Sequence, residues 1–296
     1  MTIINNHDAP ASFISFCEND RYTKGHSDYS ATQLIDEPRV VEFNRRYPEL
    51  VIDDPYENPW KFISTIFHAL MEQHSPEDEI AEERMFAEIG GVTISGAMDV
   101  QAGPDHSVTI GDYKMTTVYG IKDTKKFEQQ LNIYAWLIES QTSKVVTSLK
   151  VYAFLRDWRI SSSETVRGYP PTPGITIQLP LWDYDERESF IADKVSTLLS
   201  CKDLPDDDLP ECTHEGRWPS GTSYRVVDMR DDSYVEFDRK GYAQKHWDQL
   251  DSDSQFNSAL GKTFSEYRRC KSYCPFNKIC NTYKGFLNER SNKRSR

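Results

Sequence analysis

Long hydrophobic runs are missing from this sequence. No stretch approaches the roughly 18 apolar residues that a membrane-spanning helix requires, and the mean hydropathy is −0.68. The segment MTIINNHDAPAS at the start has no basic part followed by an apolar part, which is the pattern of a secretory signal. These absences exclude a membrane span, and we expect a cytoplasmic protein with no membrane partner.

An excess of positive charge is also missing. The chain of 296 residues has 35 Lys and Arg against 47 Asp and Glu, for a net charge of −12. This balance is unfavourable for a protein that binds nucleic acid. Much of the acid lies in two predicted loops, Pro76 to Glu83 and Asp203 to Glu211, whereas residues 122–126 and 284–296 form local basic patches. Such patches can contact phosphate even in an acidic protein.

Two short β-branched segments, residues 92–100 and 108–114, are predicted strands, with the turn residues QAGPDHS between them. A hairpin centred between Asp105 and His106 sets Asp99 directly opposite Asp112, with Cβ atoms roughly 5 Å apart. Lys114 follows Asp112 by two residues and therefore shares its face. The spacing predicts that these three side chains converge.

Two carboxylates at this distance repel each other unless a positive charge lies between them. A hard divalent cation fits, because Mg²⁺ is commonly held by one or two carboxylates together with substrate phosphate. Such an ion lowers the pKa of bound water and stabilises charge developing on phosphorus. Lys114 would orient the attacking water or stabilise the pentavalent state. The alternative is a surface hairpin with a solvated Asp/Lys pair.

Two helices are predicted around this hairpin. Residues 125–139 have helical periodicity, and Gln130 lies one turn before Tyr134 on the same face. Residues 60–72 form a second amphipathic pattern that contains His68. A solvated Gln130 and a structural His68 are the ordinary interpretations. Imidazole is nevertheless a ligand that suits a mixed nitrogen and oxygen site.

The order of these motifs resembles the RecB-type branch of the PD-(D/E)XK nuclease superfamily: a helix with His, then G-x-x-D, D-x-K and Q-x-x-x-Y. The resemblance runs from about Phe62 to Trp136, and the combination is more specific than any single motif. It implies that the metal ligands are His68, Asp99, Asp112 and the Tyr113 carbonyl, that Lys114 is the catalytic lysine, and that Gln130 and Tyr134 support the site and the DNA strand. The second acidic position is Asp112, where many members have Glu.

Cysteine use is the second informative feature. Three of the six cysteines lie close together, at Cys270, Cys274 and Cys280. In a chain without a secretion signal this spacing indicates a metal site rather than disulfides. A tetrathiolate site for zinc or an iron–sulfur cluster needs a fourth ligand from Cys17, Cys201 or Cys212. We favour Cys212, which lies in the same C-terminal region and has turn character. The alternative is three buried thiols in a small hydrophobic cluster.

This C-terminal cysteine segment resembles that of iron–sulfur RecB-type nucleases, including the CRISPR-associated members. Those proteins place their fourth cysteine upstream of the His helix, and the corresponding stretch SATQLIDEP, from Ser30, has no cysteine. The departure leaves both the fourth ligand and the metal open. We expect a [4Fe–4S] cluster or Zn²⁺ at Cys212, Cys270, Cys274 and Cys280, and Mg²⁺ or Mn²⁺ at the carboxylates.

The remaining sequence predicts an α/β architecture. A capping box at Ser30 opens a helix through about Arg46. The other predicted elements are strands at 148–156 and 174–180, a helix capped by Asp183 through about Ser200, an acidic linker at 203–211, and a hairpin at 224–237. We expect a PD-(D/E)XK restriction-endonuclease-like core over residues 1–202, with a central mixed sheet flanked by helices. Residues 203–296 then form a C-terminal hairpin and metal-binding cysteine module.

These motifs together indicate a metal-dependent DNA nuclease. We expect an exonuclease in recombination, repair or phage DNA processing, with 5′-phosphate and 3′-hydroxyl products as in the superfamily that it resembles. The alternatives are an endonuclease or junction resolvase, and a non-catalytic DNA-binding or assembly module. No G-x-x-x-x-G-K-[ST] motif is present, so unwinding requires a partner. Expected partners are single-stranded or duplex DNA ends and a helicase or a single-strand annealing or recombination protein.

Overall fold

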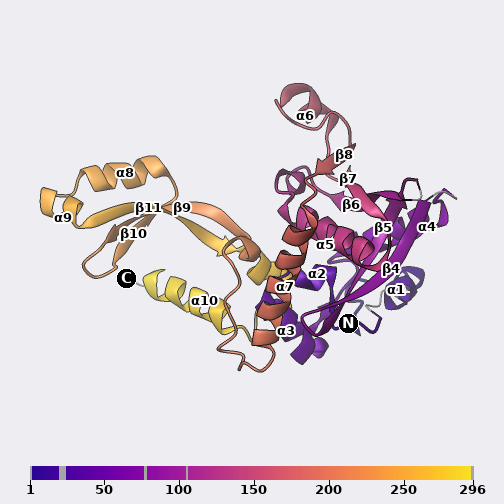
Figure 1. Cartoon of the computed structure of the whole chain (residues 1–296). Coiled ribbons are helices and arrows are strands. Elements are labelled where there is room, and N and C mark those ends of the chain that lie inside the picture. The colour runs from indigo at the N-terminus through magenta and orange to yellow at the C-terminus, as the bar shows by residue number, and fades with distance from the viewer. Residues whose placement is uncertain (1, 20–24, 77–78, 105, 295–296) are drawn as a thin grey trace. The chain divides into compact units, whose positions relative to one another are not determined.

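The computed structural model of the chain describes residues 2–19, 25–76, 79–104 and 106–294 (Figure 1). The chain forms two compact units, Met1–Leu209 and Pro210–Arg296. The division falls near the end of the predicted acidic linker rather than at its start. Three residues of the predicted loops, Glu77, Asp78 and Asp105, lie outside the described residues, as do the side chains of the basic tail beyond Glu289.

The first unit is built on a six-stranded mixed sheet, as expected for the PD-(D/E)XK fold. Its strands are β2 (Tyr29–Ser30), β4 (Glu79–Ile89), β5 (Val92–Ala102), β6 (Ser107–Thr116), β7 (Val145–Leu155) and β8 (Gly174–Leu179). They follow the order β2-β5-β6-β7-β8, and β4 pairs with β5. The β6–β7 and β2–β5 pairs are parallel, and the others are antiparallel. A separate parallel pair joins β1 (Thr2–Ile3) to β3 (Ile52–Asp53).

Helices cover both faces of this sheet. The helices of the first unit are α1 (Ala11–Glu18), α2 (Ala31–Leu34), α3 (Pro38–Arg46), α4 (Pro59–Gln73), α5 (Lys125–Gln141), α6 (Ile160–Thr165) and α7 (Tyr184–Cys201). On β6, Tyr113 contacts Phe67 of α4, whereas Lys114 lies over Phe127 of α5. Successive strand side chains point to opposite faces, so α4 and α5 cover opposite sides of β6.

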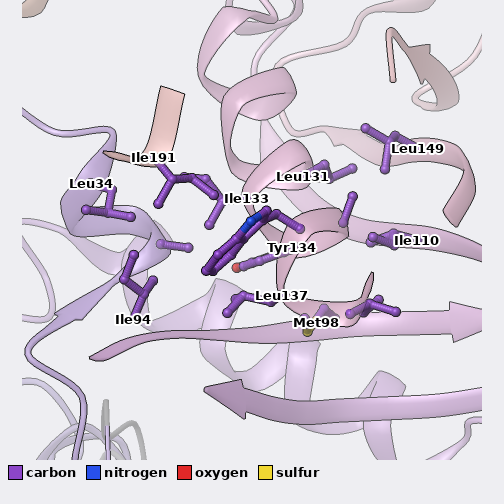
Figure 2. Close-up of a cluster of buried hydrophobic side chains, with 14 of the residues drawn as sticks. Leu34, Ile94, Met98, Ile110, Leu131, Ile133, Tyr134, Leu137, Leu149 and Ile191 are labelled. Carbon is purple, nitrogen blue, oxygen red and sulfur yellow. The ribbon is translucent and has the colours of Figure 1, made fainter. Parts of the chain in front are cut away.

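Helix α5 passes through the core of the first unit. Every residue from Gln130 to Ile138 is buried, which is the pattern of a helix covered on all sides. Its apolar side chains pack against those of β5, β6 and β7, and α2 and α7 also contribute to the cluster (Figure 2). The buried Asn132 donates to the carbonyls of Glu128 and Pro180 and accepts from the Trp182 N–H. The helix is therefore bonded to the connection between β8 and α7.

Two expectations about the secondary structure are wrong. Most of the predicted acidic loop belongs to β4, which pairs with β5 along its length. The turn between them is Gly90–Gly91, with φ of 60° and 78°, the two positive values that a two-residue hairpin requires. The predicted helix from Ser30 to Arg46 is two helices, because Pro38 begins α3 and cannot continue α2. The capping box of Ser30 and Gln33 is present.

The second unit contains a three-stranded antiparallel sheet in the order β10-β9-β11. Its elements are β9 (Pro219–Asp228), β10 (Tyr234–Phe237), α8 (Lys240–Asp248), α9 (Ser252–Phe256), β11 (Ser258–Tyr267), a π-helical turn (Arg269–Tyr273) and α10 (Asn281–Arg294). The predicted hairpin corresponds to β9 and β10. Strand β11 was not predicted, and it supplies the third strand that makes such a sheet stable.

Candidate active site

The predicted site lies where β5 and β6 separate. Their pairing runs from Ala102 opposite Thr109 to Val100 opposite Gly111, which is the register that the turn predicted. Asp99 and Asp112 occupy the next position in this register, at the opening of the fork. Gly96 lets α5 approach β5 just before this point, because a Cβ there would lie 2.7 Å from the Tyr134 ring. The G-x-x-D motif therefore serves packing as well as the site.

Asp99 is held by contacts from two other elements. Its side chain is 8% exposed, and its Oδ2 accepts a hydrogen bond of 2.7 Å from the Tyr113 N–H on β6. The same oxygen lies 3.3 Å from Nδ1 of His68 on α4. A helix and a neighbouring strand therefore bring one imidazole nitrogen and one backbone N–H donor to this carboxylate.

Asp112 is buried beside a lysine. It is 1% exposed, and its Oδ2 lies 2.6 Å from Lys114 Nζ. The pKa of Asp112 is raised to about 6, chiefly because the carboxyl group is buried; Lys114 lowers this pKa, the negative charge of Asp99 raises it, and His68 lowers it. The carboxylate is thus incompletely neutralised by the protein's own charges.

The donor set fits a hard divalent cation. Two buried carboxylates and one imidazole are close together, and a further positive charge would relieve the repulsion that raises the Asp112 pKa. The Tyr113 carbonyl stays a prediction. Among the described residues, the group whose ligand atoms all lie within 4.8 Å of one another is a different one, His7, Asp54 and Glu57. There the Asp54 oxygens already accept the N–H groups of Asn6 and Tyr56.

Gln130 and Tyr134 form a buried pair on α5. The Gln130 amide donates a hydrogen bond of 2.6 Å to the Tyr134 hydroxyl, so the ordinary expectation of a solvated glutamine is wrong. The Tyr134 ring is the group that contacts Gly96. This pair therefore connects α5 to the strand that carries Asp99.

Phe127 is a contact of the site that sequence reasoning did not recognise. Lys114 Nζ lies 6.0 Å from the centre of its ring. The residue was visible in the apolar stripe of the predicted helix, but its contact with the lysine depends on how α5 lies across β6. No sequence signal specifies that arrangement.

The cysteines of the second unit are gathered near one another. The pKa of Cys270 is raised to about 11, chiefly by burial and in smaller part by the neighbouring thiols of Cys274 and Cys280. Phe276, between them in sequence, is fully buried. Cys212 belongs to the same unit, whereas Cys17 and Cys201 are buried in the first unit.

None of the helices that the structure describes is both long enough and apolar enough to span a membrane.

A profile of the PD-(D/E)XK nuclease superfamily matches residues 57–281. This range is more than half of the chain and contains every residue of the predicted site, and the chain belongs to this superfamily. Members are nucleases, which hydrolyse phosphodiesters, and they typically use divalent metal ions.

Two solved structures resemble the chain more weakly. The structure of SSO0001 is 17% identical and aligns over 64% of this chain and 84% of that chain, with a TM-score of 0.44. A candidate exonuclease from Eubacterium rectale is 12% identical and aligns over 54% and 60%, with a TM-score of 0.32. No curated protein matches the chain. The family assignment rests on the profile match.

Proposed function

We propose that this protein is a Mg²⁺- or Mn²⁺-dependent deoxyribonuclease that degrades DNA from an end. The observation that carries the proposal is the convergence of Asp99, Asp112, Lys114 and His68 at the fork between β5 and β6. Burying two carboxylates near each other and beside a lysine costs free energy. A bound cation and a substrate phosphate would account for this arrangement.

The residues divide the work as follows. His68, Asp99, Asp112 and the Tyr113 carbonyl would hold the cation, which when bound supplies an activated water and stabilises charge on the phosphate. The ammonium group of Lys114 lies at the Asp112 carboxylate and can donate a hydrogen bond to the attacking water or to a phosphate oxygen. Gln130 and Tyr134 keep α5 against β5, so the carboxylates stay in register.

End-labelled linear, circular and single-stranded DNA, incubated with Mg²⁺, Mn²⁺ or EDTA, tests the proposal. The protein should degrade linear DNA with either metal and leave circular DNA intact. In Lys114→Ala the rate should fall on the order of 10²–10³-fold, because a preorganised positive donor is lost. Lys202→Ala, an exposed lysine at the end of α7, is the matched control. Near wild-type cleavage by Lys114→Ala would place the chemistry elsewhere.

The same assay separates the alternatives. Cleavage of circular DNA would favour an endonuclease, and selective cleavage of branched DNA would favour a junction resolvase. Binding without cleavage in either metal would favour a non-catalytic DNA-binding or assembly module.

For the second unit we propose a metal site formed by Cys212, Cys270, Cys274 and Cys280. We favour a [4Fe–4S] cluster over Zn²⁺ at this site. Burial raises the pKa of Cys270 to about 11 overall, so a bound metal cation would have to stabilise the thiolate there. Zinc–sulfur bonds of about 2.3 Å would hold four thiolates about 3.8 Å apart, whereas Cys270, Cys274 and Cys280 are not all within 4.8 Å of one another.

The visible spectrum and the elemental content of protein purified without oxygen test this assignment. We expect brown protein with about four iron atoms per chain, the content of a [4Fe–4S] cluster. Colourless protein with one zinc would decide for zinc, and well-folded protein containing neither would remove the site.

The wider role is a proposal on the same basis. We place the protein in the cytoplasm, in recombination, repair or phage DNA processing, with a RecB-type specificity. A helicase or a single-strand annealing or recombination protein would supply the unwinding or pairing that this chain does not encode.

A further inference from the structure

Two exposed aromatic rings lie beside the proposed active site, and each has a cation over it. Trp60 at the start of α4 is 43% exposed, and the guanidinium of Arg156 lies 4.7 Å from the centre of its ring. Tyr119, after β6, is 79% exposed, and Lys122 Nζ lies 5.9 Å from its ring. Exposed aromatic rings that lie near one another are typical of a surface that binds a ligand or a partner.

The two pairs belong to one surface at the carboxyl ends of β6 and β7. The Arg156 N–H donates to the carbonyl of Thr116 at 3.0 Å, and the Val118 N–H donates to the Asp157 carboxylate at 2.8 Å. These bonds hold the segment before Tyr119 alongside the segment that carries Arg156. Trp60 is therefore brought close to the loop of Tyr119 through Arg156.

This surface is continuous with the proposed metal site. Helix α4 carries Trp60 at one end and, two turns later, Phe67 and His68. The Phe67 ring packs against Phe154 of β7 at 4.8 Å and against Tyr113 of β6 at 5.8 Å. On β6, Thr116 follows Lys114 by two residues, which is about 7 Å along a strand. A polymer bound at the metal site that follows β6 toward its carboxyl end would reach these rings.

The cations of the surface are available to an anion. In the part of the chain that the structure describes, neither Arg156 nor Lys122 forms a salt bridge with a carboxylate. The nearby Asp157 is engaged by the backbone of Val118. A stacked aromatic ring with an adjacent cation matches a nucleotide, whose base has a flat face and whose phosphate is negative.

We propose that Trp60 and Tyr119, with Arg156 and Lys122, form a platform on which bases of an unpaired DNA strand stack next to the active site. The inference rests on the proposed function, because it assigns the substrate strand of that same site. Paired bases present only their edges to a protein, so the platform selects a frayed end or single-stranded DNA over an intact duplex.

Fluorescence anisotropy of the full-length protein in EDTA tests the platform without cleavage. The probes are a labelled oligothymidylate, an oligonucleotide of equal length made of abasic sites, and a blunt duplex. Wild-type protein should bind oligothymidylate about 5- to 100-fold more tightly than the abasic strand. Trp60→Ala and Tyr119→Ala should each lose most of this difference, and Trp60→Phe should keep it. Binding of the blunt duplex should stay at the wild-type level.

Matched controls keep the result specific. Tyr242 is also an exposed tyrosine, with Arg239 at 5.9 Å from its ring, and Tyr242→Ala should behave as wild type. Arg156→Ala should reduce the salt dependence of binding by about one ion. Equal binding of normal and abasic strands by wild type, an unchanged difference in Trp60→Ala and Tyr119→Ala, or an equal loss in Tyr242→Ala would overturn the platform.

The platform and the nuclease proposal fail separately. If the protein cleaves no DNA with Mg²⁺ or Mn²⁺ but prefers normal over abasic strands through these rings, the nuclease proposal fails and the platform stands. If it degrades DNA and the Trp60 and Tyr119 variants keep the full preference, the platform alone is wrong.

Discussion

At the scale of single residues, Asp112 carries the most informative electrostatics. The carboxyl group is buried, lies near Asp99, and is compensated only in part by Lys114, so its pKa rises from 3.8 to about 6. A raised pKa means that the folded protein binds this proton more tightly than the unfolded chain does. The contribution of this carboxyl group to stability is then greatest at low pH and is lost as the pH rises through its pKa in the folded protein. In metal-free protein at neutral pH, the ionised Asp112 carboxylate should therefore destabilise the fold.

Asp112→Asn should remove that destabilising effect. In EDTA, wild-type protein should lose stability relative to the variant between pH 4 and pH 7, by up to about 3 kcal/mol. At pH 7.5 the variant should melt at a higher temperature than wild type, and Mg²⁺ should raise the melting temperature of wild type only. Melting curves of both proteins at pH 5 and 7.5 measure this. An identical pH response in the two proteins would show that Asp112 ionises without cost.

His68 is the second residue with a clear test. If its imidazole is a ligand, His68→Ala should raise the metal concentration for half-maximal cleavage by at least about tenfold. If it only packs against α4 and β6, the substitution should lower the melting temperature and leave metal dependence unchanged. His74→Ala, at the exposed end of the same helix, is the control. A calorimetric Mn²⁺ titration beside a melting curve distinguishes the two results.

At the scale of elements, the contact between α5 and β5 sets the geometry of the fork. A Cβ at Gly96 would lie 2.7 Å from the Tyr134 ring and 2.8 Å from Leu137, so neither strand nor helix has room to spare. The hydrogen bond from Gln130 fixes the same tyrosine from the other side. Displacement of one ring would move both the helix and the strand that leads to Asp99.

Gly96→Ala should accordingly destabilise the protein by about 1–3 kcal/mol and reduce cleavage, because an overpacked core must shift. Gly174→Ala is the matched control, since a Cβ at this position of β8 meets nothing within 4 Å. That change should be neutral or slightly stabilising. Chemical denaturation of both variants provides the comparison, and equal stability of the two would refute the tight contact.

The elements also show where sequence reasoning succeeds. A turn centred between Asp105 and His106 predicts the β5–β6 register, because the residue numbers of each pair in a regular hairpin have the same sum. Local signals are also present for the two elements that were predicted wrongly. Gly90–Gly91 indicates the turn between β4 and β5, and Pro38 indicates the break before α3. The approach of His68 to Asp99 and the full burial of α5 depend on tertiary packing. No local pattern contains that information.

At the scale of the whole molecule, the two units of the chain differ in the apolar cores that their described residues form. The first has a large apolar core around α5. The second has few buried apolar side chains, Val226, Ala243 and Phe276 among them. A small unit of this kind commonly depends on a bound metal for stability.

Cys274→Ser should therefore lower the metal content and unfold the second unit at a lower temperature, while the first unit is little affected. Ser272→Ala, exposed in the same turn, is the control. Hydrogen exchange followed by mass spectrometry resolves the two units within the full chain. Full metal occupancy in Cys212→Ser would reject only that residue as the fourth ligand. Uniform loss of protection over both units would contradict independent stabilisation.

The parallel pairing of β6 with β7 has a consequence for synthesis on the ribosome. All the proposed ligands of the Mg²⁺ or Mn²⁺ site, and Lys114, lie between residues 68 and 114, but β6 gains its second neighbour only when residues 145–155 have emerged. Helix α5 is covered on its outer side by α7, which ends at Cys201. A nascent chain that already contains every proposed catalytic group therefore has no assembled site. The proposed activity on DNA would therefore arise only after roughly two thirds of the chain has been made.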